Sequence, residues 1–125
     1  MNEPVWLLDA AVLIAHEISL ANYGGAEGIR DPHFLASALA RPKNLFAYEK
    51  SDLYELAAAY TLGIVKNHPF IDGNKRTGFL AGAAFLELNG EILVASEPEA
   101  TRIILGVASG AVNEQQLADW YRGNT

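Results

Sequence analysis

The side chains that could do chemistry gather in one segment near the middle of the chain, from His68 to Gly78. Within eleven residues it holds an imidazole, a carboxylate, an amide, two cations, a hydroxyl and two glycines. Helical patterns precede and follow it, so we expect a short loop that leads into a helix N-terminus. Free backbone N–H groups and the positive end of the helix dipole favour a phosphate at such a place. A base, a carboxylate and an anion site together predict phosphoryl or nucleotidyl transfer.

His68 and Asp72 carry the two groups closest to that chemistry. Near neutral pH an imidazole can accept a proton from a hydroxyl that attacks phosphorus. A carboxylate is a hard oxygen ligand, which Mg²⁺ combines with phosphate oxygens and water. Each residue also has an ordinary interpretation, His68 as a satisfied histidine near a helix C-terminus and Asp72 as a turn residue or N-cap. The surrounding motif favours the chemical interpretation of His68, and for Asp72 a cap and a metal ligand are compatible.

The next four residues predict a binding site for the phosphates of a nucleotide. Gly73 lets backbone N–H groups face a phosphate with no Cβ in the way. Asn74 could orient a phosphate or a metal-bound water. Lys75 and Arg76 could offset phosphate charge, or they are two solvated basic residues. The first turn of a helix is unfavourable for cations, and this mismatch favours an anionic ligand.

Composition limits the class of protein. The chain has 125 residues, a net charge of −6 and no cysteine. Its length fits one domain, residues 1–125. The negative charge argues against a general nucleic-acid binder, and the lack of cysteine excludes disulfides and thiolate metal sites. We see neither a signal-peptide pattern nor an apolar stretch of the ~20 residues that a membrane span needs. We therefore expect a cytoplasmic protein with no membrane or direct nucleic-acid contact.

The spacing of apolar residues and caps predicts an all-α fold. Six helices are expected, at about residues 9–21, 32–41, 52–67, 74–88, 96–108 and 113–121. Asp9 is the expected N-cap of the first helix, and capping-box pairs begin the third, fifth and sixth. The helix after the motif is apolar almost all round from Phe79 to Leu88, which predicts a place at the centre of the bundle.

The segment between the second and third helices is less regular. Pro42 is expected to close the second helix, so residues 42–50 should form a loop or small hairpin. Phe46 and Tyr48 in that segment could dock a target or fold back onto the core. Lys66, two residues before His68, could face the phosphates, although an exposed helix lysine is the commoner case.

The segment from His68 onward resembles the signature of the Fic/Doc family, written His-Pro-Phe-x-Asp/Glu-Gly-Asn-Gly-Arg-x-x-Arg for Fic enzymes. It is more similar to the death-on-curing (Doc) toxin branch, where the loop continues Asn-Lys-Arg-Thr. The likeness extends over about residues 10 to 90, through Gly24-Gly25, Gly28–Asp31, Leu39–Pro42 and Phe85–Gly90. It implies a Fic/Doc-like bundle of about six helices around a buried central helix, with a small loop or hairpin flap.

The same resemblance implies roles for individual residues. His68 would be the general base, and Asp72 would hold Mg²⁺. The phosphates of ATP would be held by residues 73–76. Phe46 and Tyr48 would lie where the family has the flap that docks the target.

Two departures from the Fic pattern bear on the reaction. Lys75 stands in place of the second glycine and would crowd the α-phosphate, and Phe79 stands in place of the second arginine, which holds the distal phosphates. Both match the Doc branch. That resemblance implies that the nucleotide binds reversed and that its γ-phosphate goes to a threonine of elongation factor Tu, which stops protein synthesis. Two alternatives stay open: AMP transfer to a protein hydroxyl, and a non-catalytic binding module of the same fold.

The Doc resemblance also implies a partner, a small Phd-like antitoxin whose disordered tail folds on binding. We expect an apolar groove that accepts an amphipathic segment. Its predicted walls are the first helix, through Leu13, Ile14 and Ile18, and the helix at residues 100–107.

Overall fold

The computed structural model describes residues 2–125, and these residues fold into helices without a strand. The helices are α1 (Asp9–Tyr23), α2 (Pro32–Glu49), α3 (Leu53–Asn67), α4 (Asn74–Leu88), α5 (Glu97–Ser109) and α6 (Glu114–Gly123). The predicted all-α fold of six helices is therefore confirmed. Extended pairing is limited, over the same range, to one isolated bridge between Ile29 and Phe70.

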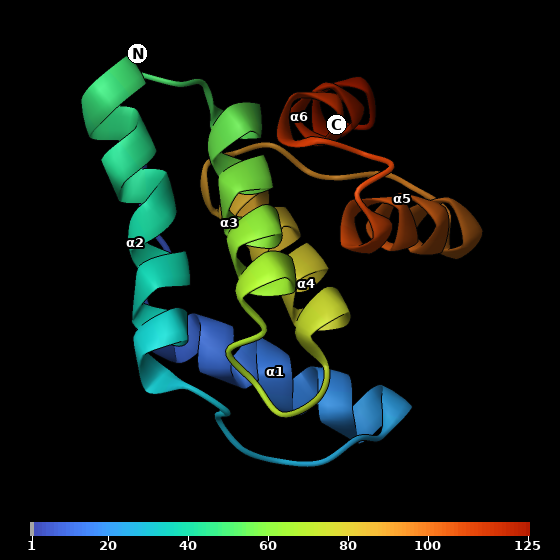
Figure 1. Cartoon of the computed structure of the whole chain (residues 1–125). Coiled ribbons are helices and arrows are strands. Elements are labelled where there is room, and N and C mark those ends of the chain that lie inside the picture. Colours follow the sequence, from blue (N-terminus) through green and yellow to red (C-terminus); the bar gives the residue numbers. More distant parts are fainter. Residues whose placement is uncertain (1) are drawn as a thin grey trace.

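Helix α3 lies at the centre of the bundle, with α2, α4 and α6 packed against it (Figure 1). Nine of its fifteen residues are buried. The expectation that the helix after the motif is central is wrong, because α4 exposes Ala84 and Glu87. Its glycines Gly78 and Gly82 reflect a close approach to α3, where Tyr121 of α6 also meets Gly82, and not burial on all sides.

That close approach is tightest at Gly82. A Cβ there would lie 2.5 Å from the Tyr121 hydroxyl oxygen and 3.1 Å from the Ala57 carbonyl oxygen. The neighbouring Thr61 hydroxyl donates to the Gly78 carbonyl at 2.8 Å and lies 2.7 Å from the Tyr121 hydroxyl. Polar groups of α3, α4 and α6 therefore meet inside the core and are satisfied there.

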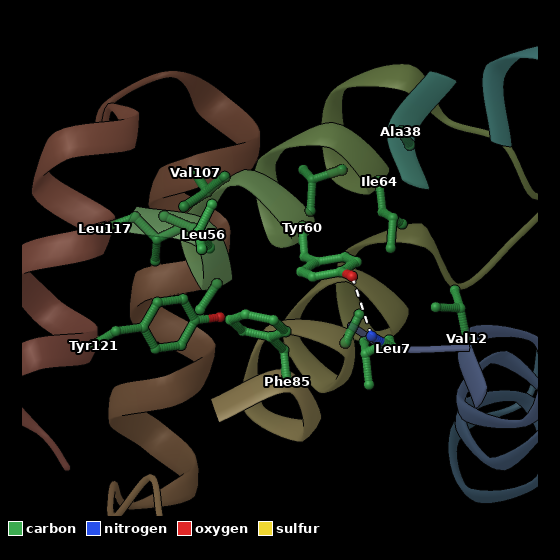
Figure 2. Packing of buried hydrophobic residues seen from close by; sticks show 14 of the residues in the cluster. Leu7, Val12, Ala38, Leu56, Tyr60, Ile64, Phe85, Val107, Leu117 and Tyr121 are labelled. Atoms are coloured by element: carbon green, nitrogen blue, oxygen red, sulfur yellow. Dashed lines mark hydrogen bonds between the residues drawn. The ribbon is translucent and has the colours of Figure 1, made fainter. Parts of the chain in front are cut away.

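Aliphatic side chains and a few aromatic rings, among them Tyr60, Phe85 and Tyr121, fill the rest of the core between the helices (Figure 2). Tyr60 and Phe85 pack with ring centroids 5.1 Å apart, and both are almost fully buried. The Tyr60 hydroxyl accepts a hydrogen bond from the Leu7 N–H at 3.3 Å, drawn as a dashed line in Figure 2. This bond fixes the segment before α1 to the central helix, and burial raises the pKa of Tyr60.

Helix α2 is longer than predicted, and the expected flap at residues 42–50 is wrong. Pro42 lies inside the helix, and the helix continues to Glu49. A proline inside a helix costs about 3 kcal/mol, because it removes one hydrogen bond and crowds the preceding turn. In α2, Pro42 and Phe46 are both buried, and Phe46 packs edge-on against Trp6. Core packing thus holds the helix together past its proline.

Most of the predicted helix starts are confirmed. Asp31 caps α2, and complete capping boxes begin α3 (Asp52 with Glu55) and α6 (Asn113 with Gln116). At α5 half of the expected box forms, because the Glu99 carboxylate binds Arg102 and Trp120 instead of returning to the cap. Asp9 is the first residue of α1, whose cap position is Leu8, so its role as N-cap is wrong.

Candidate active site

The loop between α3 and α4 holds the motif and runs past α1 at one end of the bundle (Figure 1). His68 caps the C-terminus of α3 with φ 51° and ψ 54°, which is left-handed and uncommon for a residue other than glycine. The Arg30 side chain holds it there. Its Nε donates to the His68 carbonyl at 2.6 Å and its guanidinium to the Asn67 carbonyl at 2.9 Å. Backbone strain of this kind points to function.

The segment before α2 lines the outside of the same loop. The Ile71 N–H donates to the Gly28 carbonyl at 3.0 Å, and the Arg30 N–H donates to the Pro69 carbonyl at 2.7 Å. Phe70, between these contacts, is fully buried. The loop is therefore fixed by backbone bonds to a segment about forty residues earlier in the chain.

The Asn74 side chain stabilises the loop through hydrogen bonds to the backbone of Phe70. Its Oδ1 accepts from the Phe70 N–H and its Nδ2 donates to the Phe70 carbonyl, both at 2.9 Å. Nδ2 also lies 3.3 Å from Nδ1 of His68. Because an amide nitrogen only donates, the neutral His68 ring keeps its lone pair on Nδ1 and its hydrogen on Nε2. The Asn74 side chain is fully used in these contacts, so its backbone N–H is what it can offer to a phosphate.

The N-terminus of α4 is open to a ligand. Gly73 is its cap and supplies no side chain, and the first hydrogen bond runs from the Thr77 N–H to the Gly73 carbonyl at 2.9 Å. The N–H groups of the first turn therefore have no partner within the helix. Lys75 is exposed beside them. The Arg76 guanidinium lies 3.3 Å from the centre of the Tyr23 ring, a cation–π contact that holds it at the same place.

Asp72 is exposed next to this helix start. Its Oδ2 accepts from the Ala26 N–H at 2.9 Å, and within residues 2–125 its Oδ1 has no hydrogen-bond partner. The carboxylate does not cap α4, so the N-cap interpretation is wrong. Gly25 permits the approach, since a Cβ there would lie 3.1 Å from the Asp72 Cβ. Across the described part of the chain no three His, Cys, Asp or Glu side chains cluster as a ready metal site.

These residues share one cleft of about 580 Å³ between the loop, the end of α1 and α5. It brings together His68 and every residue from Asp72 to Arg76. Phe79 also lines it, and its ring lies near Trp120 and Tyr121, with centroids 6.2 and 6.3 Å away. The apolar walls come from α1 and α5, the two helices predicted to form them, but Leu13 and Ile14 of α1 do not line the cleft. The wall residues include Ile18, Ala100, Ile104 and Leu105.

Three predicted site residues lie elsewhere. Lys66 faces a second hollow, of about 540 Å³, and its Nζ lies 3.5 Å from the Ala108 carbonyl. Tyr48 borders that hollow near the far end of α2 and is 90% exposed. Phe46 is a core residue, so it cannot present its ring to a target.

Sequence reasoning missed two residues that support the site, His16 and Tyr23, and for Arg30 it predicted a structural salt bridge or cap together with Asp31. Tyr23 stacks on Arg76, and its hydroxyl donates to Glu97 at 3.3 Å across the cleft. Arg30 holds the carbonyls at the end of α3. The glycine-rich segment at residues 24–28 was the available signal, because its left-handed glycines mark close backbone approach.

The all-α fold and the motif loop define a protein of the Fic/Doc class. Residues 6–86 match the Fic/DOC family. The chain belongs to this family.

Two relatives place it among the Doc proteins. It is 32% identical over 112 residues to the protein kinase Doc of Escherichia phage P1. The aligned region covers 89% of this chain and 88% of that protein. It is 39% identical over 77 residues to the toxin Doc of Mycolicibacterium smegmatis, and this aligned region covers 58% of each chain. No helix in residues 2–125 is both long and apolar enough to cross a membrane.

Proposed function

We propose that this protein is a Doc-like toxin that transfers the γ-phosphate of ATP to a Ser or Thr hydroxyl of a translation protein. Elongation factor Tu is the first candidate target. One observation carries the proposal. The exposed imidazole of His68, the Asp72 carboxylate with one oxygen lacking a hydrogen-bond partner, and the uncapped N-terminus of α4 all face a single cleft. The kinase name of the phage P1 relative supports the same reaction.

His68 acts as the base in this proposal. Its Nδ1 lone pair accepts the proton of the target hydroxyl, whose oxygen forms a bond to the γ-phosphorus. The bond from that phosphorus to the bridging oxygen breaks, and ADP leaves. The contact from Asn74 at 3.3 Å is long for a hydrogen bond, so an incoming hydroxyl can displace it.

The residues around the cleft fit Mg²⁺ and the phosphates. The partner-free Oδ1 of Asp72 is a suitable carboxylate ligand for Mg²⁺, which neutralises phosphate charge when bound. The open N–H groups of α4, with Lys75 and Arg76, would hold the phosphate oxygens. Since Arg76 is already stacked on Tyr23, little side-chain freedom is lost when it binds.

Two residues favour the γ-phosphate over the AMP group. Phe79 packs near two aromatic rings at the place where a second arginine would extend into the cleft. Lys75 adds charge and bulk at the loop. With a single arginine, the terminal phosphate is the group expected beside His68.

The same cleft suits a partner. Ile18 on α1 and Ile104 and Leu105 on α5 give it apolar walls beside the phosphate-binding loop. We propose that an amphipathic segment of an antitoxin, Phd-like in having a disordered tail, docks along these walls. A partner bound there would cover the entrance used by the nucleotide and restrain the toxin.

The experiment is a reaction of the purified protein with elongation factor Tu, ATP and Mg²⁺. We expect ADP to form and one hydroxyl of the target to gain a phosphate, detected by mass spectrometry. The same reaction with a cell lysate in place of elongation factor Tu separates the two parts of the proposal. Phosphate on a different lysate protein would refute the target alone, and no phosphoprotein in either reaction would refute the kinase.

A further inference from the structure

A buried histidine on α1 contacts the loop between α3 and α4, and it has no role in the proposed chemistry. His16 is one of three buried residues on the inner face of α1, with Val12 and Ser19, and it is 6% exposed. Its ring stacks on Phe70 with centroids 3.8 Å apart and planes 10° apart. A histidine placed only for packing would leave its nitrogens unpaired in the core, which is costly.

His16 is paired, and its partner belongs to the site. Its Nε2 lies 2.8 Å from the backbone carbonyl oxygen of Asp72. Because a carbonyl oxygen only accepts, Nε2 carries the hydrogen and donates it. Asp72 is thus held at two atoms, at its carbonyl by His16 and at Oδ2 by the Ala26 N–H.

The bond to the carbonyl also sets the direction of the next N–H. The peptide unit between Asp72 and Gly73 is trans and planar, so its C=O and N–H point in opposite directions. With the carbonyl turned toward His16, the Gly73 N–H points away from it. Over residues 2–125 this N–H has no hydrogen-bond partner, so it adds one donor to the open start of α4.

Gly73 lies against the same face of α1 as His16 and Ser19. A Cβ at Gly73 would lie 3.5 Å from Cδ2 of His16 and 3.5 Å from Oγ of Ser19. Gly73 itself is left-handed, with φ 81°. Since α1 is a regular helix packed on α4, His16 is a firmer support than the exposed segment that carries Ala26.

We propose that His16 is a positioning residue that fixes the peptide between Asp72 and Gly73, so that the Asp72 carboxylate and the Gly73 N–H are both presented to the ligand. This inference rests on the proposed function for the identity of the ligands, phosphate and Mg²⁺. The orientation of the peptide itself can be tested without any reaction.

The test compares two variants of nearly equal length. His16→Gln keeps an N–H donor at about the place of Nε2, and His16→Met fills the same space without a donor. Both variants lose the imidazole ring beside Gly73, so a resonance shift alone does not separate them; in the unliganded protein we expect the hydrogen exchange of the Gly73 amide to change in the methionine variant only. His33→Met is the control, because His33 is exposed on the first turn of α2.

The second readout is binding, followed through the same amide resonances during titration with inorganic phosphate and then with MgCl₂. Loss of a group that orients a metal ligand typically weakens binding about 10–100-fold, so we expect at least about tenfold weaker binding for methionine and restoration by glutamine. If methionine prevents folding, His16→Asn, whose amide is too short to reach the carbonyl, takes its place.

A Gly73 amide that exchanges at the same rate in the methionine and wild-type proteins would overturn the proposal, as would a folded glutamine variant that exchanges and binds like methionine. A change in Gly73 hydrogen exchange confined to methionine supports it even in a protein that phosphorylates nothing. Failure of the proposed function and failure of this inference are thereby distinguished.

Discussion

At the scale of single residues, the backbone of His68 is under more constraint than its side chain. The residue is left-handed, its carbonyl is held by Arg30, and its ring is exposed with one long contact to Asn74. Replacing the side chain therefore leaves the clamps on the loop in place.

His68→Ala is expected to lower phosphate transfer about 10²–10⁴-fold, the usual cost of losing a general base. ATP binding and the melting temperature should change little. His68→Asn tests the same loss with a residue that tolerates the left-handed region, and His33→Ala is the control. Transfer by either His68 variant at the wild-type rate would contradict the assignment.

At the scale of elements, the contact between α3 and α4 depends on the lack of a side chain at Gly82. Gly82→Ala should destabilise the protein by about 1–3 kcal/mol, because its methyl group would overlap the Thr61 and Tyr121 hydroxyls. Gly123→Ala, with nothing near its Cβ, is the matched control. Urea unfolding gives the comparison, and equal midpoints for the two variants would refute the packing argument.

The N-terminus of α3 is expected to respond to acid through Asp52. Burial raises the pKa of this carboxyl, but hydrogen bonds from the Glu55 N–H and from Arg122 outweigh it, so the pKa lies below its ordinary value of 3.8. A lowered folded-state pKa adds stability above the unfolded-state pKa, and this stability is lost as pH falls through the folded-state value.

Asp52→Asn keeps the cap and removes the charge, whereas Asp52→Ala removes both and should cost about 1 kcal/mol more. The stability difference between wild type and Asp52→Asn should be present at neutral pH and shrink below about pH 4. Thermal melts across pH 7 to 3 measure it. A difference that stays constant over that range would show that the charge does not contribute.

The elements also show what the sequence could and could not predict. The caps were readable because Asp52 and Asn113 satisfy backbone groups within the next turn, which is local information. The end of α2 was not, because Pro42 is a helix breaker by itself and only contacts with Trp6 and the core keep the helix intact to Glu49. The central place of α3 depends likewise on packing between distant segments.

The same distinction applies to the site. The residues from His68 to Arg76 are contiguous, so a motif could reveal them all. His16 and Arg30 lie 56 and 38 residues from the loop residues that they bind, and nothing in their spacing shows which side of a helix meets which loop. Phe46 was predicted to dock a target but is buried in the core, because α2 continues past Pro42 and only the folded structure shows this.

At the scale of the whole molecule, one cleft is the proposed site of both the nucleotide and the partner. Ile18→Asp and Leu105→Asp place charges on its apolar walls, where both residues line the cleft and are exposed. We expect each to prevent co-purification of a small second chain expressed from the native operon. Tyr48→Asp, on the other side of the bundle, should leave co-purification intact. Equal capture by all three variants would place the partner elsewhere.

The proposed function depends above all on one step, the transfer of the γ-phosphate of ATP with His68 as the base. Parallel reactions with ATP labelled at the α- or the γ-phosphate, each with the wild type and His68→Ala, test this step in the presence of Mg²⁺ and the target protein. We expect labelled protein from the γ-position only, and only with the wild type. Label from the α-position would show AMP transfer and contradict the roles proposed for Lys75 and Phe79.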